Sequence, residues 1–332
     1  MKLRVMLLFA AICAASHVTV SADEACRDGT CASNPNDLRK VLTDSEDVAD
    51  YVVRMRRELH LQPELMWTET KTSALVKREL TAFGVSFEEV SSPGVVATIG
   101  SGSAPVVALR ADLDALPVTE ESDIPAERRS QVPGKMHACG HDGHTAMLLG
   151  AAKVLKSVEG SLRGTVRLVF QPAEEGGAGA RRMLEDGLRA MKPPIESSFA
   201  LHNWPYPETP SGTVGTRSGT IMAGSGAFEM TLRGAGGHAA VPHKNVDVVV
   251  CGSAVVMAMQ TIVSRLTDPL DSALITVTVF DAGGDADNVM ADTARLMGQF
   301  HAVNKRTLEW IHGAIVKEAT GTAKAHGCEA AV

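Results

Sequence analysis

The sequence predicts an α/β protein of two domains. A chain of 332 residues is long for one compact core and suggests about two domains. Residues 46–217 alternate helical patterns with short apolar runs of the kind expected for buried strands. Residues 218–332 show a strand–helix–strand–strand–helix–strand order, which indicates a two-layer sandwich of ferredoxin-like type.

Composition favours a globular protein that acts on a small molecule. Hydrophobic residues make up 45% of the chain and charged residues 21%, which excludes a disordered protein. The 39 acidic and 32 basic residues give a formal net charge of −7, and no run of Lys or Arg stands out. This balance argues against nucleic acid as the main partner, so we expect a small-molecule substrate.

Residues 1–22 are typical of a cleaved signal peptide. Lys2 and Arg4 supply a positive start, residues 5–15 an apolar run, and residues 20–22 a cleavage site of small side chains. The apolar run is too short for an anchor, and no later stretch approaches the length of about 18 apolar residues that a membrane span needs. We therefore expect a secreted or secretory-lumen protein without a membrane partner.

Residues 23–45 form a polar leader that we expect to be loosely ordered. Cys26 and Cys31 lie close together in it, and an oxidising compartment would make them a plausible small disulfide. The alternative, that both stay free or pair with another chain, remains open.

Three helices and four strands are expected in residues 46–217. Apolar residues recur at helical spacing from Val48 to Phe83 with a break near Pro63, which predicts two helices, and residues 146–158 predict a third. Short apolar runs predict the strands 95–99, 106–109, 165–170 and 199–201. Three polar residues near the break are interpreted as surface and capping residues rather than metal ligands: His60, Glu64 and Glu69.

The main candidate for a metal site is the stretch 135–144, which contains Cys139, His137, His141 and His144. Cysteine and histidine are ordinary donors for a borderline-soft divalent ion. Cys139 and His141 are separated by one residue and can converge on one ion if the backbone between them is extended. Taken singly, His137 and His144 are better interpreted as surface or packed histidines, and Cys139 as a buried thiol. As a cluster, these residues predict metal binding.

Further candidates follow the ends of predicted strands. Asp112 lies where open α/β sheets place their active sites, although a loop-capping aspartate is an equally good interpretation. Glu174 and Glu175 are adjacent, so one carboxylate can bind a metal while the other acts as a general base, the alternative being a solvated acidic loop. His202 follows the last of these strands. Because separate segments each deliver such residues, a shared site is favoured.

On these motifs, the sequence resembles the metallo-amidohydrolases of the aminoacylase and carboxypeptidase peptidase superfamily, in the branch of hippurate hydrolases and auxin-amino acid conjugate hydrolases. The resemblance covers most of the chain from about Asp44 onward. Cysteine in place of aspartate in the metal cluster is specific to that branch. The matching stretches are residues 57–60, 109–117, 136–144, 171–177, 201–205 and 236–243.

The resemblance implies a mixed-sheet catalytic domain with a centre of two divalent ions, Mn²⁺ or Zn²⁺. It makes Glu174 the general base and acid. Asp112 would not bind the metal itself but would hold one of the metal ligands in position. The residues alone could not decide which glutamate is the ligand. The ligands that the resemblance implies are Cys139, His141, Glu175 and His202.

For residues 218–332, the resemblance implies a lid domain that is inserted into the catalytic domain and often forms a homodimer. His238, in a Gly-rich turn, would stabilise the developing oxyanion, and Asn288 would lie near the substrate. His301 stands where the family usually has an arginine that can grip a substrate carboxylate. A neutral imidazole offers one donor in place of a charged bidentate fork, which puts recognition of a free α-carboxylate in question.

In the family, the chain returns from the lid to the catalytic domain and adds further sheet and a last histidine ligand. This sequence ends at Val332 as the fourth lid strand begins, so we expect the C-terminal part of the catalytic domain to be absent. Two functions then stay open. The first is metal-dependent hydrolysis of the amide bond of N-acyl amino acids or similar conjugates, with a dipeptidase as its variant. The second is a catalytically impaired relative that binds metal or dimerises.

Overall fold

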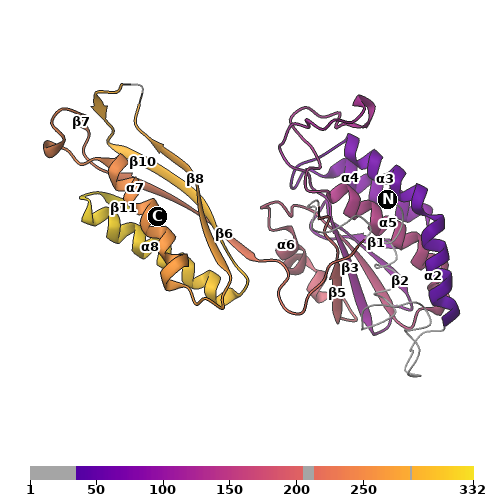
Figure 1. Ribbon diagram of the computed structural model, residues 1–332. Helices are drawn as coiled ribbons and strands as arrows, with labels where there is room; N and C mark the ends of the chain where they lie inside the picture. Colours follow the sequence, from indigo (N-terminus) through magenta and orange to yellow (C-terminus); the bar gives the residue numbers. More distant parts are fainter. Residues whose placement is uncertain (1–34, 205–212, 285) are drawn as a thin grey trace. The chain divides into compact units, whose positions relative to one another are not determined.

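The computed structural model describes residues 35–204, 213–284 and 286–332, and the chain divides into two compact units (Figure 1). The first unit extends to Gly215 and the second from Thr216 to Val332. Each unit has its own hydrophobic core. The predicted signal peptide and the pair of Cys26 and Cys31 lie outside the described residues.

The first unit is built on a mixed five-stranded sheet with the order β1-β2-β4-β3-β5, which confirms the predicted α/β class. The strand β1 is antiparallel to β2, and β2 to β4, whereas β3 runs parallel to both β4 and β5. All seven residues of β4 are buried, which explains its nearly continuous apolar sequence. The strands are β1 (Ser86–Glu89), β2 (Val95–Gly100), β3 (Val106–Asp112), β4 (Thr165–Gln171) and β5 (Ser197–Ala200).

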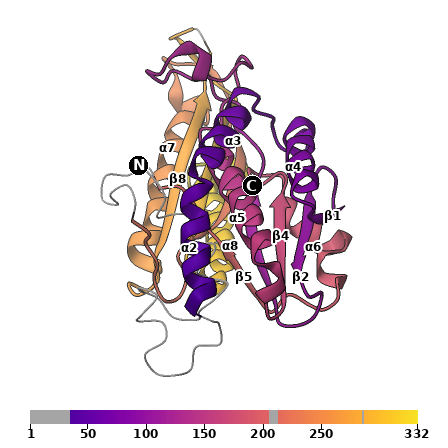
Figure 2. The same ribbon diagram turned by 90° about the vertical axis from the view of Figure 1, so that its right-hand side faces the viewer.

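Helices cover both faces of this sheet (Figures 1 and 2). On one face, α3, α4 and α5 bury a large core against alternate strand residues such as Val95, Ala97 and Ile99. On the other, α6 packs Met183 against residues of opposite alternation such as Val96. The helices are α2 (Pro35–Asp47), α3 (Ala49–Leu61), α4 (Thr70–Ala82), α5 (His141–Ser157) and α6 (Gly179–Asp186).

The strand β1 and the helix α6 were not predicted, and two further segments differ from the expectation. The second half of the leader is a helix, α2, not a loose extension, because Val41 packs with Val48 and Val154 in a small core of its own. The helix α5 begins at His141, five residues before the predicted start at Ala146. Its first turn is polar, so the apolar periodicity that predicts a helix begins only after it. This turn is nevertheless buried, because other segments supply partners for its charged groups.

The second unit has the βαββαβ order expected for this part of the chain. Its sheet has the strand order β11-β6-β10-β8 with antiparallel neighbours, and α7 and α8 share one core with it. A separate ribbon pairs β7 (Gly237–His238) with β9 (Val289–Met290). The main elements are β6 (Gly224–Arg233), α7 (Val248–Thr261), β8 (Ala273–Ala282), β10 (Thr293–Ala302), α8 (Lys305–Ala325) and β11 (Glu329–Ala331). Short 3₁₀ helices occupy Ala126–Arg128, Glu159–Ser161, Leu188–Ala190 and Pro242–Lys244.

A π-helical turn, Ile262–Leu266, extends α7 to a 19-residue stretch, Val248–Leu266. By length and composition this stretch could cross a membrane, with a mean hydropathy of 1.6, so the expectation that no stretch approaches such a span was wrong. In the structure, one face of α7 lies in the core of the second unit. A core helix has the same apolar composition, so this helix alone is weak support for a membrane span.

Candidate metal centre

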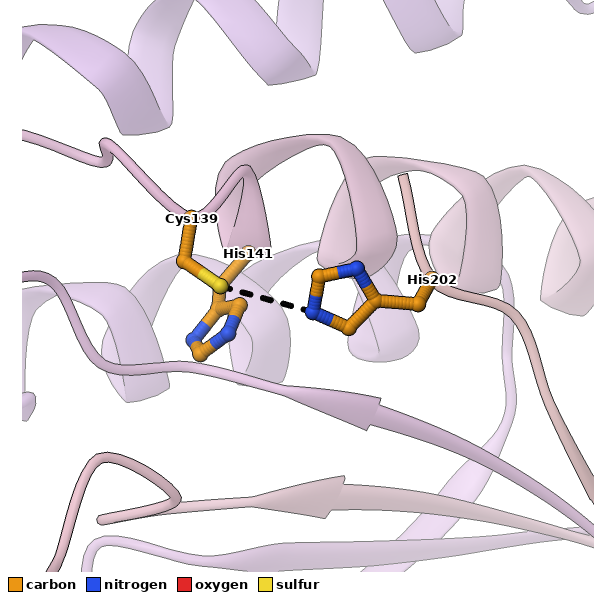
Figure 3. Close-up of side chains that lie close together, drawn as sticks. All are labelled: Cys139, His141 and His202. Carbon is orange, nitrogen blue, oxygen red and sulfur yellow. Dashed lines mark hydrogen bonds between the residues drawn. The ribbon is translucent and has the colours of Figure 1, made fainter. Parts of the chain in front are cut away.

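The candidate residues meet at one edge of the first sheet. Because β3, β4 and β5 run parallel, their carboxyl ends lie together, and they carry Asp112, the Glu174–Glu175 pair and His202. The segment before α5 adds Cys139, and the first residue of α5 adds His141 (Figure 3). Residues far apart in the sequence are therefore assembled into one site.

Three overlapping groups of possible donors share His141, and two of them contain the ligands that the resemblance implies; the third joins it to Asp112 and His144. In the first, the Cys139 Sγ atom lies 3.4 Å from the His202 Nε2 atom, and a His141 donor completes a set whose atoms are all within 4.8 Å of one another (Figure 3). In the second, His141 Nε2 lies 3.9 Å from a carboxylate oxygen of Glu174 and 3.9 Å from one of Glu175. The structure thus brings together all four ligands implied by the resemblance.

Unpartnered polar atoms show that these residues fit divalent cations. Buried His141 Nε2 and Glu175 Oε1 have no hydrogen-bond partner among the described residues, whereas Asp112 Oδ2 is paired with Arg110 at 2.7 Å. Leaving such atoms unpaired costs roughly 1–3 kcal/mol each, so a native structure normally satisfies them. Sulfur, imidazole and carboxylate are also the donor set that Zn²⁺ or a similar ion prefers. The two donor groups could hold two neighbouring ions.

His141 is aimed by Asp114, a residue that the sequence analysis did not select. The His141 Nδ1 atom is 2.8 Å from the Asp114 carbonyl oxygen and 3.3 Å from its carboxylate, which leaves Nε2 facing the site. The Asp114 carboxylate also accepts the Glu175 N–H at 2.9 Å. Its signal in the sequence was a second aspartate two residues after Asp112, which places both on the same side of an extended segment.

The electrostatics of the site favour bound positive charge. Burial opposes protonation of His141, but its hydrogen bond to Asp114, and next the proximity of Cys139, raise the pKa of His141 to about 11. The neighbouring His141 ring, and next the hydrogen bond with His202, lower the pKa of the Cys139 thiol. A thiolate is the form of cysteine that binds metals. The Cys139 thiolate and the carboxylates near His141 therefore stabilise a bound cation.

Asp112 and His144 form a fixed support beside the donors. Asp112 Oδ1 is 2.7 Å from His144 Nδ1, and His144 Nε2 accepts the Asn203 N–H at 2.8 Å. Burial opposes ionisation, but the bond with His144 and the charge of Arg110 hold the pKa of Asp112 well below its usual range. Both nitrogens of His144 are thus occupied within the protein, and its ring is a packed histidine. Asp112 Oδ2 lies 3.7 Å from His141 Nε2.

Glu174 has the properties of a proton carrier. Its side chain is 40% exposed. The carboxylates of Asp112 and Asp114 are held by hydrogen bonds to His144 and to the Glu175 N–H, whereas no such bond holds the Glu174 carboxylate among the described residues. Partial burial, and next the charge of Glu175, raise the pKa of Glu174 above its usual value. A carboxylate that is accessible and more basic than usual suits general acid–base catalysis near neutral pH.

Two expectations near the metal site were wrong. His60 and Glu69 are not surface residues but are buried, with 1% and 0% exposure. The His60 ring bonds Asp142 at 2.7 Å, and Glu69 accepts a backbone N–H from the segment after β4. Glu64 does act as a cap, since its carboxylate accepts the Thr72 N–H in the first turn of α4.

The backbone of the donor cluster also differs from the expectation. Gly140, between Cys139 and His141, is not extended but left-handed, with a φ of +91°, and the chain turns there directly into α5. His137 is buried, and neither of its ring nitrogens has a hydrogen-bond partner among the described residues.

In the second unit, the structure brings two predicted residues together. His238 lies on β7, where its side chain is exposed, and the adjacent Ala239 donates its N–H to the Asn288 carbonyl at 3.0 Å. His301 lies on a different element, β10, paired with Ser225 and Leu274. His238 and Asn288 thus share the β7–β9 ribbon, and His301 does not.

The fold and the donor set define a class: a metal-dependent hydrolase built on a mixed α/β sheet, followed by a βαββαβ unit. The chain belongs to the peptidase family M20/M25/M40, whose model matches residues 108–319. It is 45% identical over 310 residues to the IAA-amino acid hydrolase ILR1-like 5 of Arabidopsis thaliana, an alignment that covers 91% of this chain and 69% of that protein. This confirms the resemblance expected from the sequence.

Two other relatives are similar over most of the chain. The N-acetylcysteine deacetylase of Bacillus subtilis (strain 168) is 37% identical over 282 residues, which cover 84% of this chain and 72% of that protein. The crystal structure of the Bacillus subtilis YxeP protein, a dinuclear metal binding peptidase from the M20 family, has a TM-score of 0.68 at 33% identity and covers 85% of this chain and 72% of that one. The chain spans 64% of the length of three further Arabidopsis IAA-amino acid hydrolases.

Proposed function

We propose that this protein hydrolyses the amide bond of N-acyl amino acids or similar amide conjugates in a metal-dependent reaction. The observation that carries the proposal is the place of Glu174: a partly exposed carboxylate 3.9 Å from His141 Nε2, an atom that has no hydrogen-bond partner in the described part of the chain. A metal-binding protein without turnover needs the donors but not a free carboxylate beside them. The relatives named for hydrolysis of an amino acid conjugate and for deacetylation of N-acetylcysteine support the same class of substrate.

The chain's own residues then have separate roles. Cys139, His141, Glu175 and His202 would hold two divalent ions. When bound, these ions would polarise the scissile carbonyl and acidify the attacking water. Glu174 takes a proton from that water and passes it to the leaving amine, so the products are a carboxylate and a free amino group.

The metal is proposed to be Mn²⁺ or Zn²⁺. The thiol and imidazole donors favour a softer ion such as Zn²⁺, whereas the family branch that the sequence resembles is often manganese-dependent. Elemental analysis of the purified protein, followed by reconstitution of the metal-free chain with each ion, distinguishes them. Two ions per chain would support the proposed centre, and a content near zero after reconstitution would contradict it.

A dipeptidase is the second candidate within the same class. The thermostable carboxypeptidase 2 of Saccharolobus solfataricus is 38% identical over 273 residues, which cover 81% of this chain and 67% of that protein. A side-by-side assay of N-acetyl amino acids and unmodified dipeptides decides between the two substrates. Faster cleavage of the dipeptides would replace the first candidate by the second.

For the second unit, we propose a lid domain that is inserted into the catalytic domain and forms a homodimer. Large apolar side chains exposed on α7 and on the edge strand β8 support an interface between two copies: Val250, Met257, Leu274 and Phe280. We further propose that His238 stabilises the oxyanion across this dimer and that Asn288 binds substrate, supported by the resemblance and by their shared ribbon.

We also propose that residues 1–22 are removed as a signal peptide and that the protein is secreted. The N-terminal sequence of the mature protein tests the last point.

The variant Glu174→Ala tests the proposed catalysis. Because Glu174 is assigned to proton transfer and not to ligation, turnover of an N-acetyl amino acid should fall by at least about a hundredfold while the bound metal stays nearly unchanged. Glu185→Ala, which removes an exposed acid of α6, is the matched control and should keep full activity.

Loss of metal together with activity in Glu174→Ala would mean that the roles of Glu174 and Glu175 are exchanged. If the unmodified protein binds two ions and still hydrolyses neither N-acyl amino acids nor dipeptides, the proposal fails, and a non-catalytic relative is the remaining interpretation.

A further inference from the structure

Glu69 is a buried carboxylate that the proposed chemistry does not use. It lies at the start of α4 with 0% exposure, and its Oε1 atom accepts the Ala173 N–H at 2.7 Å, 104 residues further along the chain. Its Oε2 atom has no partner among the described residues. Burying an ionisable group costs free energy unless it is fully bonded, so a purely structural site would be expected to hold an apolar side chain.

The group that Glu69 holds is the backbone just before the two glutamates of the metal centre. The strand β4 ends at Gln171, so the Ala173 N–H has no neighbouring strand to bond. Ala173 is also left-handed, with a φ of +52°, a conformation that costs a non-glycine residue roughly 1 kcal/mol or more. The bond from Glu69 stabilises this unfavourable backbone, from which Glu174 and Glu175 project.

The same loop holds the far end of this turn. Trp67 donates its Nε1–H to the Gly177 carbonyl oxygen at 3.1 Å. The turn is packed closely there, since a Cβ atom on Gly177 would lie 2.6 Å from the Ala173 Cβ atom and 2.8 Å from Trp67 Nε1. Residues 173–177 are therefore fixed at both ends by the loop between α3 and α4.

This loop also contacts the residue that follows Asp114. The Ala115 N–H donates to the Glu64 carbonyl oxygen at 2.8 Å, beside a β-bridge between Leu65 and Ala115. Asp114 orients His141 and accepts the Glu175 N–H. One short loop thus supports two of the backbone segments that build the metal centre.

We propose that Glu69 is a positioning residue for the metal centre: through the Ala173 backbone, it sets the directions of the Glu174 and Glu175 side chains. The inference rests on the proposed function for the roles of the two glutamates. The structural claim, that Glu69 fixes the conformation of the turn 172–178, does not depend on whether the protein is an enzyme. A displacement of about 1 Å in such a turn can lower a rate by about a hundredfold, so a single buried bond is enough to matter.

A matched pair of variants separates the hydrogen bond from simple filling of space. Glu69→Gln keeps an acceptor oxygen at the same position, whereas Glu69→Met has a similar size and leaves the Ala173 N–H unpaired. Glu64→Ala is the control, because among the described residues the Glu64 carboxylate bonds only the first turn of α4, through Thr70, Lys71 and Thr72. All variants are made in the full chain.

Three measurements are compared: amide hydrogen exchange in residues 173–178, the Kd for Mn²⁺ alone, and kcat and KM for an N-acetyl amino acid. For Glu69→Met we expect exchange at least about tenfold faster in that turn, weaker Mn²⁺ binding, and a kcat about a hundredfold lower at a nearly unchanged KM. Glu69→Gln should keep most of the wild-type values. Glu64→Ala should leave the exchange of the turn unchanged.

The inference is overturned if Glu69→Met leaves both the exchange of the turn and the Mn²⁺ affinity unchanged, or if Glu69→Gln is as damaged as Glu69→Met. The exchange and metal measurements need no substrate, so they still decide this inference if the wild-type protein proves inactive and the proposed function fails. If Glu69→Met does not fold, Trp67→Phe removes only the second bond of the turn, and unchanged exchange at residues 176–178 in that variant also counts against the inference.

Discussion

Two buried histidines beside the metal centre have pKa values that are shifted in opposite directions, because their neighbours differ. The bond of His60 with Asp142 raises its pKa, although burial opposes this shift, and Glu120 adds a second carboxylate at 3.2 Å. His137 has no such bond, and burial lowers its pKa to about 4. His60 is therefore the more basic ring, in a network with Asp142 that includes Arg56, and His137 is the less basic ring.

This contrast predicts a pH-dependent contribution of His60 to stability. Because the folded-state pKa lies above the ordinary value of 6.5, the stabilisation is complete below that value and is lost as the pH rises through the raised pKa. We expect His60→Gln to lower the free energy of unfolding by about 2 kcal/mol at pH of about 6 and by less at pH of about 9. Urea denaturation at both pH values measures the difference.

The exposed His326, just past α8, gives the control His326→Gln, which should show no such pH dependence. A loss in His60→Gln that is equal at both pH values would show that the ring acts through its shape and not through its charge.

Among the secondary-structure elements, α5 has a start that depends on the conformation of the preceding residue, Gly140. Gly140 is left-handed with a φ of +91°, and a Cβ atom there would lie 2.4 Å from the side-chain nitrogen of Asn203. That nitrogen donates to the Gly140 carbonyl oxygen at 2.9 Å, and the Asn203 backbone N–H bonds His144. The junction therefore links the start of α5 to the segment that carries His202.

Gly140→Ala should accordingly weaken both folding and metal binding. Gly134→Ala is the matched control, since Gly134 also has a positive φ, +71°, but its Cβ atom would meet nothing within 4 Å. We expect a loss of about 1 kcal/mol in unfolding free energy for Gly134→Ala and about 2–3 kcal/mol for Gly140→Ala. Chelator competition should show weaker Mn²⁺ binding in Gly140→Ala alone. Equal metal affinities in the two variants would contradict the proposed link to His202.

At the scale of the whole molecule, the second unit exposes apolar side chains and an unpaired strand edge that lie outside its own core. Met257 is 69% exposed on α7, on the face opposite to buried Val255 and Met259. The strand β8 is an edge of its sheet, with one side free for pairing. A homodimer through α7 and β8 would cover both features.

We therefore expect Met257→Asp to convert a dimer into a folded monomer in sedimentation analysis. If His238 acts across the dimer, this monomer should also lose turnover by about a hundredfold. Leu270→Asp, at a loop position with 93% exposure, is the control and should stay dimeric and active. A wild-type monomer, or a dimer that persists in the Met257→Asp variant, would rule out this interface.

The sequence by itself determined the order of the main elements, apart from β1, α2 and α6, and most of the candidate donor set. Cys139, His141 and His202, with the Glu174–Glu175 pair, could be found because donor residue types cluster locally or follow apolar runs, and parallel strands bring such positions to one edge. The identity of the ligand glutamate came only from the resemblance.

The tertiary structure decided which of the remaining polar residues are buried and what they hold. His60 bonds Asp142 82 residues away, and Glu69 bonds Ala173 104 residues away, so nothing in their local sequence separates them from surface caps. The early start of α5 at His141 has the same cause, because a polar first turn is stable inside the protein only when distant segments supply its partners. Periodicity reports which face of an element is apolar, whereas the satisfaction of buried charges depends on contacts that exist only in the folded chain.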